Sequence, residues 1–273
     1  MYPPIPRKVL TGFRSPLPRA TQVAVTAKKA SPTMIIDVYA DPVCPWCFVG
    51  KRRLDRALGR LPAPVPGLHW RAFQLNPRLV WEWYDYRRRL VVEAKPNPAH
   101  EAIARMETLF PEFHLITQNI DGLHQRAGSR KVIELHGNIT RTKCFDEDAI
   151  ISSWKETGDV PPKCPNCGGL LRPDVVWFEE LLPQPELEMA LHAATTCDVF
   201  LSIGTSAVVY PAAALPLEAH RCGATVVVIN PQPTPLSDHA HYVLVGAAGV
   251  VLPRLMKALR DTGRTGSRKS NPA

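Results

Sequence analysis

The sequence lacks any run of 18 consecutive apolar residues, although hydrophobic residues make up 45% of its 273 positions. Since a transmembrane helix needs about 20 such residues, we expect no membrane span. The start of the chain also lacks the apolar core of a secretory signal peptide. Seven cysteines are too few for a disulfide scaffold in a chain of this length. Two Cys-x-x-C pairs instead indicate redox chemistry or metal binding in a reducing compartment, and we expect a cytoplasmic protein.

Acidic residues are missing from residues 1–36, which carry six Lys and Arg residues, and residues 260–273 carry four basic residues and one acid. These two ends account for the whole formal charge of +8 and leave the remainder close to neutral. A nucleic-acid-binding domain would concentrate positive charge on a folded face, so we predict no nucleic-acid partner. We predict a disordered leader over residues 1–33, with a transit peptide as the alternative, and a disordered tail over residues 260–273.

Apolar strands alternate with amphipathic helices along most of the chain. The pattern predicts strands at residues 34–40, 69–75, 114–117, 132–135, 175–178, 199–203, 225–229 and 242–245. It predicts helices at residues 45–61, 79–92, 98–110, 185–195, 211–221 and 250–259. This order is typical of an α/β fold with a doubly wound parallel sheet. Residues 144–169 are polar and rich in Pro and Gly, which indicates a small inserted module.

Polar residues follow several of the predicted strands. Taken singly, each such segment is more often an ordinary turn than a binding site. Together and in order, five segments resemble the sirtuin family of NAD-dependent protein-lysine deacylases. They read ITQNIDGLHQRAG (116–128), IELHGN (133–138), CPNCGGLLRPDVVWF (164–178), IGTSAVVYPAA (203–213) and VVVIN (226–230). The resemblance covers about residues 77–259 and implies a Rossmann-like sheet with a small zinc-ribbon-like module at residues 138–174.

The resemblance implies a role for individual residues. His136 would be the general base that accepts a proton from a ribose hydroxyl of NAD, a task that suits an imidazole. The cofactor-binding residues would be Gln118, Asn119 and Asp121 around the nicotinamide ribose, and Gly204, Thr205, Ser206 and Asn230 on the adenosine and phosphate side. Val176 and Phe178 would flank the acyl-lysine of a protein substrate, partly by strand-like pairing.

Tyr84 and Arg87 match the Tyr-x-x-Arg signature of class III sirtuins. At this spacing both side chains lie on one face of a helix. Arg87 would grip a carboxylate while Tyr84 donates a hydrogen bond, which implies succinyl- or malonyl-lysine as well as acetyl-lysine substrates. The alternative is an amphipathic helix with a solvated arginine face.

The cysteines match the zinc module of the family in part. Cys144, Cys164 and Cys167 would be zinc ligands, but Glu147 stands where a fourth cysteine is expected. A carboxylate can ligate zinc, although we expect three thiolates and a carboxylate to hold it more weakly than four thiolates.

The sequence lacks the glycine-rich phosphate loop with which sirtuins begin, and Glu179 replaces a family glycine. Residues 34–77 instead resemble the start of a DsbA-like thioredoxin-superfamily protein, with Cys44 as nucleophile and Cys47 as resolving thiol. We therefore predict a thioredoxin-like βαβ fragment at residues 34–76, joined near residues 76–77 to a deacylase domain at residues 77–259. Its strand and helix could fill the vacant first βα position of the Rossmann sheet.

The leading hypothesis is a deacylase that transfers the acyl group to ADP-ribose. The alternatives are a thiol-disulfide oxidoreductase and a catalytically inactive fusion or truncation product. The oligomeric state stays open.

Overall fold

The computed structural model describes residues 9–10, 34–38, 68–178 and 180–266 of the chain. The described strands are β1 (Val9–Leu10), β2 (Met34–Val38), β3 (Phe113–Thr117), β4 (Val132–Glu134), β5 (Gly137–Cys144), β6 (Leu171–Val175), β7 (Val199–Ile203), β8 (Thr225–Asn230) and β9 (Tyr242–Val245). The described helices are α2 (Leu68–Leu75), α3 (Pro77–Glu93), α4 (Pro98–Glu107), α5 (Leu123–Arg126), α6 (Gln184–Thr196), α7 (Leu215–Arg221) and α8 (Ala248–Gly266), with short 3₁₀ turns η1 (Ala212–Ala214) and η2 (Pro235–Asp238). None of these helices is long and apolar enough to cross a membrane.

Seven strands form one parallel sheet in the order β1-β9-β8-β7-β2-β3-β4. The chain builds β2, β3 and β4 outward in one direction and then returns to place β7 on the other side of β2. This is the doubly wound, Rossmann-like order, and ligands in such sheets bind beyond the carboxyl ends of the strands at the switch point. The predicted α/β class with a Rossmann-like parallel sheet is confirmed, and its switch point lies between β2 and β7.

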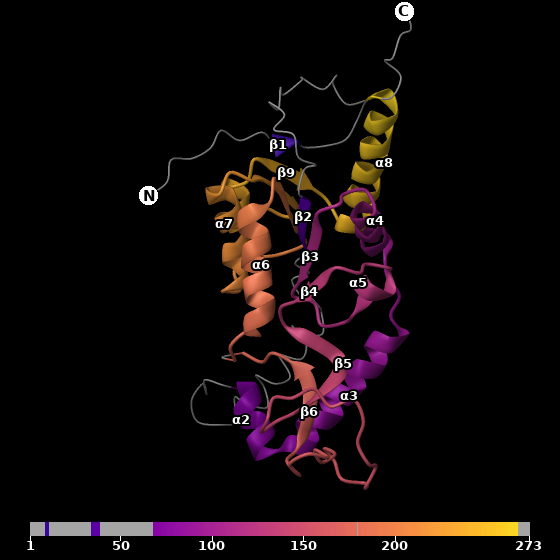
Figure 1. Ribbon diagram of the computed structural model, residues 1–273, viewed down its shortest axis with the longest axis vertical. Helices are drawn as coiled ribbons and strands as arrows, with labels where there is room; N and C mark the ends of the chain where they lie inside the picture. The colour runs from indigo at the N-terminus through magenta and orange to yellow at the C-terminus, as the bar shows by residue number, and fades with distance from the viewer. Residues whose placement is uncertain (1–8, 11–33, 39–67, 179, 267–273) are drawn as a thin grey trace, which may run out of the picture.

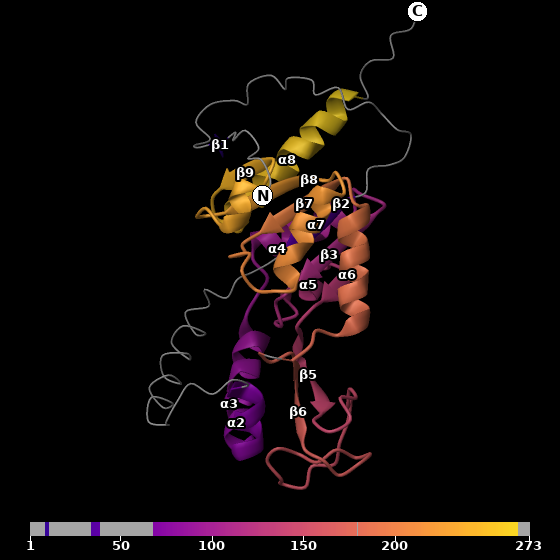
Figure 2. The ribbon, with the colours of Figure 1, turned by 90° about the vertical axis from the view of Figure 1, so that its left-hand side faces the viewer.

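Helices cover both faces of the sheet (Figures 1 and 2), with α6 and α7 on one face and α4 and α8 on the other. Side chains alternate between the faces because successive residues of a strand point in opposite directions. Ile116 and Phe200 lie in the core beneath α6 and α7, whereas Leu115 and Leu201 lie in the core beneath α4 and α8. The apolar strands are therefore buried on both faces, as parallel strands require.

The strand β2 comes from the segment that resembles another family. Its residues pair in parallel with β3 on one side and with β7 on the other. The hypothesis that this strand fills the vacant first position of the sheet is confirmed for residues 34–38. The helix predicted at residues 45–61, Cys44 and Cys47 lie outside the described residues, as do most of the predicted leader and Glu179. The DsbA-like resemblance stays a prediction.

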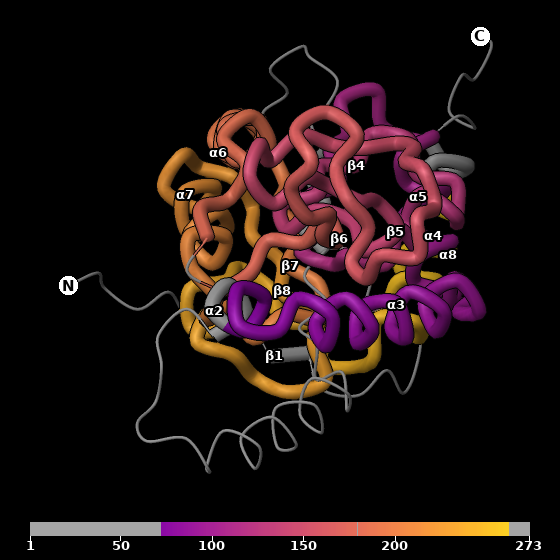
Figure 3. The backbone as a smooth tube through the Cα atoms, turned by 90° about the horizontal axis from the view of Figure 1, so that it is seen from below, coloured from indigo at the N-terminus to yellow at the C-terminus, as the bar shows by residue number. Residues whose placement is uncertain are grey.

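A second, smaller unit lies below the sheet, where α3 runs across the antiparallel pair of β5 and β6 (Figure 3). Two sequence predictions fail here. Residues 68–75 form the helix α2 rather than a strand, and its Phe73 packs against Phe145 and Trp177. The strand predicted at residues 175–178 instead ends at Val175, because its register against β5 stops at Gly137. In both places tertiary packing overrides the local pattern.

Candidate functional site

His136 follows β4 and lies at the carboxyl edge of the sheet. Its Nδ1 atom lies 3.1 Å from the backbone oxygen of Gln118, in the loop after the neighbouring strand β3. A carbonyl oxygen only accepts hydrogen bonds, so this contact requires the proton on Nδ1 and leaves Nε2 with a free lone pair in the neutral ring. Burial lowers the pKa of His136 below 6.5, although the hydrogen bond to Gln118 acts to raise it. The ring is therefore a neutral base at physiological pH.

The backbone around His136 has little freedom to move. Gly137 has φ +75°, and a Cβ atom there would collide with the backbone oxygen of Asp174. Glycine is thus required at this position. Directly after β6, Val176 donates its backbone N–H to the carbonyl of His136 at 3.0 Å. Two predicted site residues, one proposed for the base and one for the substrate strand, are therefore joined directly.

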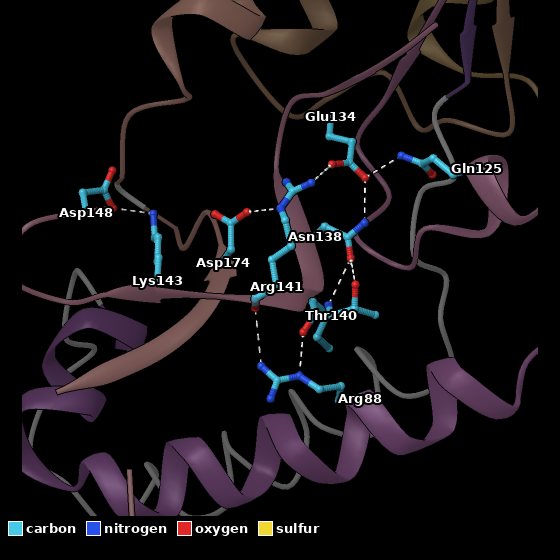
Figure 4. Close-up of polar contacts among 10 residues, drawn as sticks. Arg88, Gln125, Glu134, Asn138, Thr140, Arg141, Lys143, Asp148 and Asp174 are labelled. Atoms are coloured by element: carbon cyan, nitrogen blue, oxygen red, sulfur yellow. Dashed lines mark hydrogen bonds and ion pairs between the residues drawn. The ribbon is translucent and has the colours of Figure 1, made fainter. Parts of the chain in front are cut away.

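A polar network centred on the buried side chains of Glu134 and Asn138 surrounds this segment (Figure 4). The Glu134 carboxylate, only 9% exposed, accepts hydrogen bonds from Gln125 at 2.7 Å, Asn138 at 2.7 Å and Arg141 at 2.6 Å. Arg141 also donates to Asp174 at 2.8 Å. The network ties residues on both sides of His136 to α5 and to β6. Sequence reasoning missed it, although a lone acid within the apolar strand Val132–Glu134 was a signal that partners must exist.

The loop after β3 carries three predicted cofactor residues. The Thr117 hydroxyl accepts the backbone N–H of Asn119 at 3.0 Å, and the Asp121 carboxylate accepts the N–H of Leu123 at 2.9 Å. Gln118, Asn119 and Asp121 are all half-buried. The loop is thus held by its own side chains at the sheet edge where His136 lies.

The other four predicted cofactor residues lie at the carboxyl ends of β7 and β8. Gly204 follows β7 with φ +67° and donates its N–H to Ile229 on β8 at 2.9 Å. The Thr205 hydroxyl accepts the N–H of Ala207 at 2.9 Å, and the Asn230 amide donates to the carbonyl of Gln232 at 2.7 Å. Ser206 is half-buried between them in sequence. All four lie at the same carboxyl edge as His136, because the strands are parallel.

The segment after β6 is held by an ion pair between the buried Arg172 and the half-buried Glu180. Arg172, 1% exposed, makes a two-point contact with the Glu180 carboxylate and donates to the Val175 carbonyl at 2.6 Å. Glu180 also accepts the backbone N–H of Trp177 at 2.7 Å. Burial acts to raise the pKa of Glu180, but the bonds from Arg172 and Trp177 hold it below its usual range. Of the predicted substrate residues here, Val176 is half-buried and Phe178 is exposed.

Tyr84 and Arg87 lie together on α3, as the i, i+3 spacing predicts. The Arg87 guanidinium carbon lies 5.5 Å from the centre of the Tyr84 ring and 4.8 Å from that of Trp83. Tyr84 is buried, and its hydroxyl accepts a hydrogen bond from the indole nitrogen of Trp177 at 2.9 Å. Arg87 is half-buried, and both interpretations of this pair, an acyl-binding site and an arginine face, stay open.

Four side chains form a candidate metal centre in the small unit. The donor atoms of Cys144, Glu147, Cys164 and Cys167 all lie within 4.8 Å of one another. Tetrahedral zinc with Zn–S bonds of about 2.3 Å separates two sulfur ligands by about 3.8 Å, and the sulfurs of Cys144 and Cys167 are 3.5 Å apart. The donor set therefore fits zinc. Glu147 offers the fourth donor atom, at the position where the sequence has no cysteine.

The environment of His124 leads us to expect that the fold loses stability in acid. It is 2% exposed, and both ring nitrogens lack a hydrogen-bond partner among the described residues. Burial, followed by the neighbouring His100, lowers the pKa of His124 from 6.5 to about 3. A depressed pKa in the folded state stabilises the fold above pH 6.5, and this contribution is lost as the pH falls toward 3.

We expect the free energy of unfolding to fall by about 2 kcal/mol more between pH 6.5 and 5 in the wild type than in His124→Phe. Urea denaturation at the two pH values measures this difference. His192→Phe, at an exposed position on α6, is the control and should keep the full acid sensitivity of the wild type. Equal acid sensitivity in the wild type and His124→Phe would contradict the prediction.

Comparisons with known proteins agree on one family. The model of the Sir2 family matches residues 68–211, more than half of the chain. A protein of Aquifex aeolicus named NAD-dependent protein deacylase is 48% identical over 191 residues, covering 70% of this chain and 80% of that protein. NAD-dependent protein deacylase 1 of Caldanaerobacter subterraneus is 53% identical over 171 residues, covering 62% and 71% respectively.

Solved structures give the same result for the fold. A Sir2 homologue in complex with NAD superimposes with a TM-score of 0.68 at 37% identity, over 84% of this chain and 90% of that one. A Sir2 homologue bound to ADP-ribose gives a TM-score of 0.72 at 39% identity, over 88% and 96%. Sir2Tm bound to a propionylated peptide gives 0.67 at 30% identity, over 84% and 94%.

Proposed function

The chain belongs to the Sir2 family, and from this premise we propose that it is an NAD-dependent protein-lysine deacylase with His136 as its general base. The observation that carries the proposal is the contact of the His136 Nδ1 atom with the backbone oxygen of Gln118. Because Nδ1 is engaged by this carbonyl, Nε2 is the atom that accepts a proton. The relatives support this activity and give no support to the thiol-disulfide alternative.

The residues at the carboxyl edge fit NAD by their chemistry. Amide and carboxylate groups of Gln118, Asn119 and Asp121 suit the carboxamide and hydroxyls of the nicotinamide ribose. Gly204, Thr205, Ser206 and Asn230 would hold the adenosine and phosphate side, where a glycine turn allows close approach. When bound, NAD would supply a ribose carbon from which nicotinamide leaves, and the remaining ADP-ribose would accept the acyl group.

The chain's own residues have three tasks in this reaction. His136 removes a ribose hydroxyl proton at Nε2, and the contact with Gln118 keeps the ring in the orientation that the transfer needs. Val176 and Phe178 flank the acyl-lysine, and Val176 is already fixed to the backbone of His136. This direct connection keeps the substrate strand and the base in register.

We further propose acyl-lysine proteins as substrates and the cytoplasm as the compartment. The solved complex of Sir2Tm with a propionylated peptide supports the substrate class. No disulfide joins the five described cysteines, as expected in a reducing compartment.

The acyl group we propose is acidic. Arg87 and Tyr84 lie side by side on α3 and would bind a succinyl or malonyl carboxylate by charge and by hydrogen bonding. We expect Arg87→Met to lower the ratio of kcat/KM for succinyl-lysine over acetyl-lysine by roughly 10- to 100-fold, since hydrogen bonds to charged groups are worth about 1.5–3 kcal/mol.

Mass spectrometry of succinyl- and acetyl-lysine peptides, with and without NAD, measures this ratio. The matched control is Arg89→Met on the same helix, because Arg89 is paired with Asp85 at 3.4 Å and exposed. It should keep the wild-type ratio. If the wild type removes acetyl groups faster than succinyl groups, the acidic-acyl proposal is wrong while the deacylase activity stands. If folded wild-type protein removes neither group with NAD, the proposed function fails.

A further inference from the structure

The Tyr84 hydroxyl has a partner from a distant part of the chain, and its role deepens the proposed function, on which this inference rests. The indole N–H of Trp177 donates to the Tyr84 oxygen at 2.9 Å. Both side chains are 3% exposed, and their ring centres lie 6.4 Å apart. The bond joins α3, which carries the proposed acyl-binding pair, to the segment after β6 that flanks the acyl-lysine.

Trp177 is itself held on two sides. The guanidinium carbon of Arg172 lies 3.5 Å from the centre of a Trp177 ring, and the Trp177 backbone N–H is bonded to Glu180 at 2.7 Å. Arg172 and Glu180 form an ion pair with each other, of which the arginine is buried. The indole therefore has a fixed orientation, and its N–H points at Tyr84 without needing to reorganise when substrate binds.

This contact determines which way the Tyr84 hydroxyl can donate. An indole N–H only donates, so the Tyr84 oxygen must be the acceptor in this bond, and its own proton stays available for another acceptor. Burial raises the pKa of Tyr84 above 10, although Arg87 and the bond from Trp177 act to lower it. The hydroxyl is therefore protonated at working pH and can donate. Arg87 lies against the same ring.

We propose that Trp177 is a specificity-determining positioning residue, which orients the Tyr84 hydroxyl as a hydrogen-bond donor to the carboxylate of an acidic acyl chain. Without the indole N–H, the hydroxyl is free to rotate and its proton loses a defined direction. An acidic acyl group is affected by this loss, whereas an acetyl group offers no carboxylate to that donor. Trp177 thereby affects acyl preference through Tyr84.

Trp177→Phe tests the proposal, since it keeps an aromatic ring in the cluster but removes the N–H. We expect the ratio of kcat/KM for succinyl-lysine over acetyl-lysine to fall about tenfold, with the change mainly in KM. The affinity of a succinyl-lysine peptide, measured by fluorescence anisotropy without NAD, should fall by a similar factor. Tyr84→Phe should lower the ratio equally. The double variant should lose no more than either single one, because both act through one hydrogen bond.

Trp154→Phe is the matched control, because the Trp154 indole nitrogen is buried without a hydrogen-bond partner among the described residues. It should keep the wild-type ratio and peptide affinity. An unchanged ratio in Trp177→Phe overturns the proposal, and so do additive losses in the double variant. If Trp177→Phe does not fold, Tyr84→Phe decides alone, and an unchanged ratio there also overturns it. If the folded wild-type protein shows no turnover with NAD, this result instead refutes the proposed deacylase function.

Discussion

His136→Ala is expected to lower kcat/KM for an acyl-lysine peptide by about 10²- to 10⁴-fold, the usual contribution of a positioned general base. The loss should appear mainly in kcat, because the imidazole acts in the chemical step rather than in peptide binding. Mass spectrometry of peptide turnover at saturating NAD measures it. His192→Ala, at an exposed position on α6 and away from the carboxyl edge of the sheet, is the control and should keep full activity.

The pH profile gives a second readout of the same residue. Burial lowers the pKa of His136 below 6.5. A base is active when it is unprotonated, so kcat/KM should stay high at pH 6.5 and decline only at lower pH. An acidic limb centred above pH 6.5 would contradict the assignment of His136 as a buried neutral base, and so would a variant lacking His136 that keeps wild-type turnover.

Cys164→Ser is expected to abolish stoichiometric zinc binding and to loosen the small unit. Structural zinc sites contribute about 10–16 kcal/mol of apparent binding free energy, most of which supports the local fold. Cys144 and Cys164 are part of the buried cluster with Ile151 and Leu171, against which Trp81 and Trp154 pack. Loss of the metal should therefore expose these indoles and shift the tryptophan fluorescence to longer wavelength.

Glu147→Cys is the complementary variant, because it replaces the carboxylate by the softer ligand that zinc prefers. We expect it to tighten zinc binding by about 10²-fold, measured by competition with a chromogenic chelator. Purified wild-type protein with no zinc in elemental analysis, and no uptake from a zinc buffer, would refute the site. Equal zinc affinity in the wild type and Glu147→Cys would show that Glu147 is not a ligand.

Much of the α/β core follows from local pattern. The strands Val199–Ile203 and Tyr242–Val245 lie where the apolar runs predict them. Val199–Ile203 is buried on both faces of the sheet, and a strand in that position has a continuous apolar sequence. Residues 68–75 were predicted wrongly, since a short apolar and aromatic run does not distinguish helix from strand. Here the packing of Phe73 against Phe145 and Trp177 decides the outcome, and those residues are distant in sequence.

The candidate site, like the fold, can be predicted from the sequence only in part. The motifs predict a base, a cofactor loop after β3 and three metal ligands, because these residues cluster at strand ends or in short pairs. The bond between Tyr84 and Trp177 and the three donors to Glu134 join residues from separate elements. Such contacts depend on how the small unit packs on the sheet. The hydrophobic periodicity of a single segment carries no information about that packing. Burial of a lone acid was the only local indication.

The central position of β2 has a consequence for the order in which the chain can fold. Met34 pairs with Phe113 on one side and with Val199 on the other, so more than half of the chain lies between β2 and its second partner, and β2 is synthesised before both. On the ribosome, this strand waits for β3 and then, much longer, for β7. Pairings of such long range are slow to form, and the exposed strand edge is prone to association in the meantime. Nascent chains of this protein should therefore depend on chaperones until β7 has emerged.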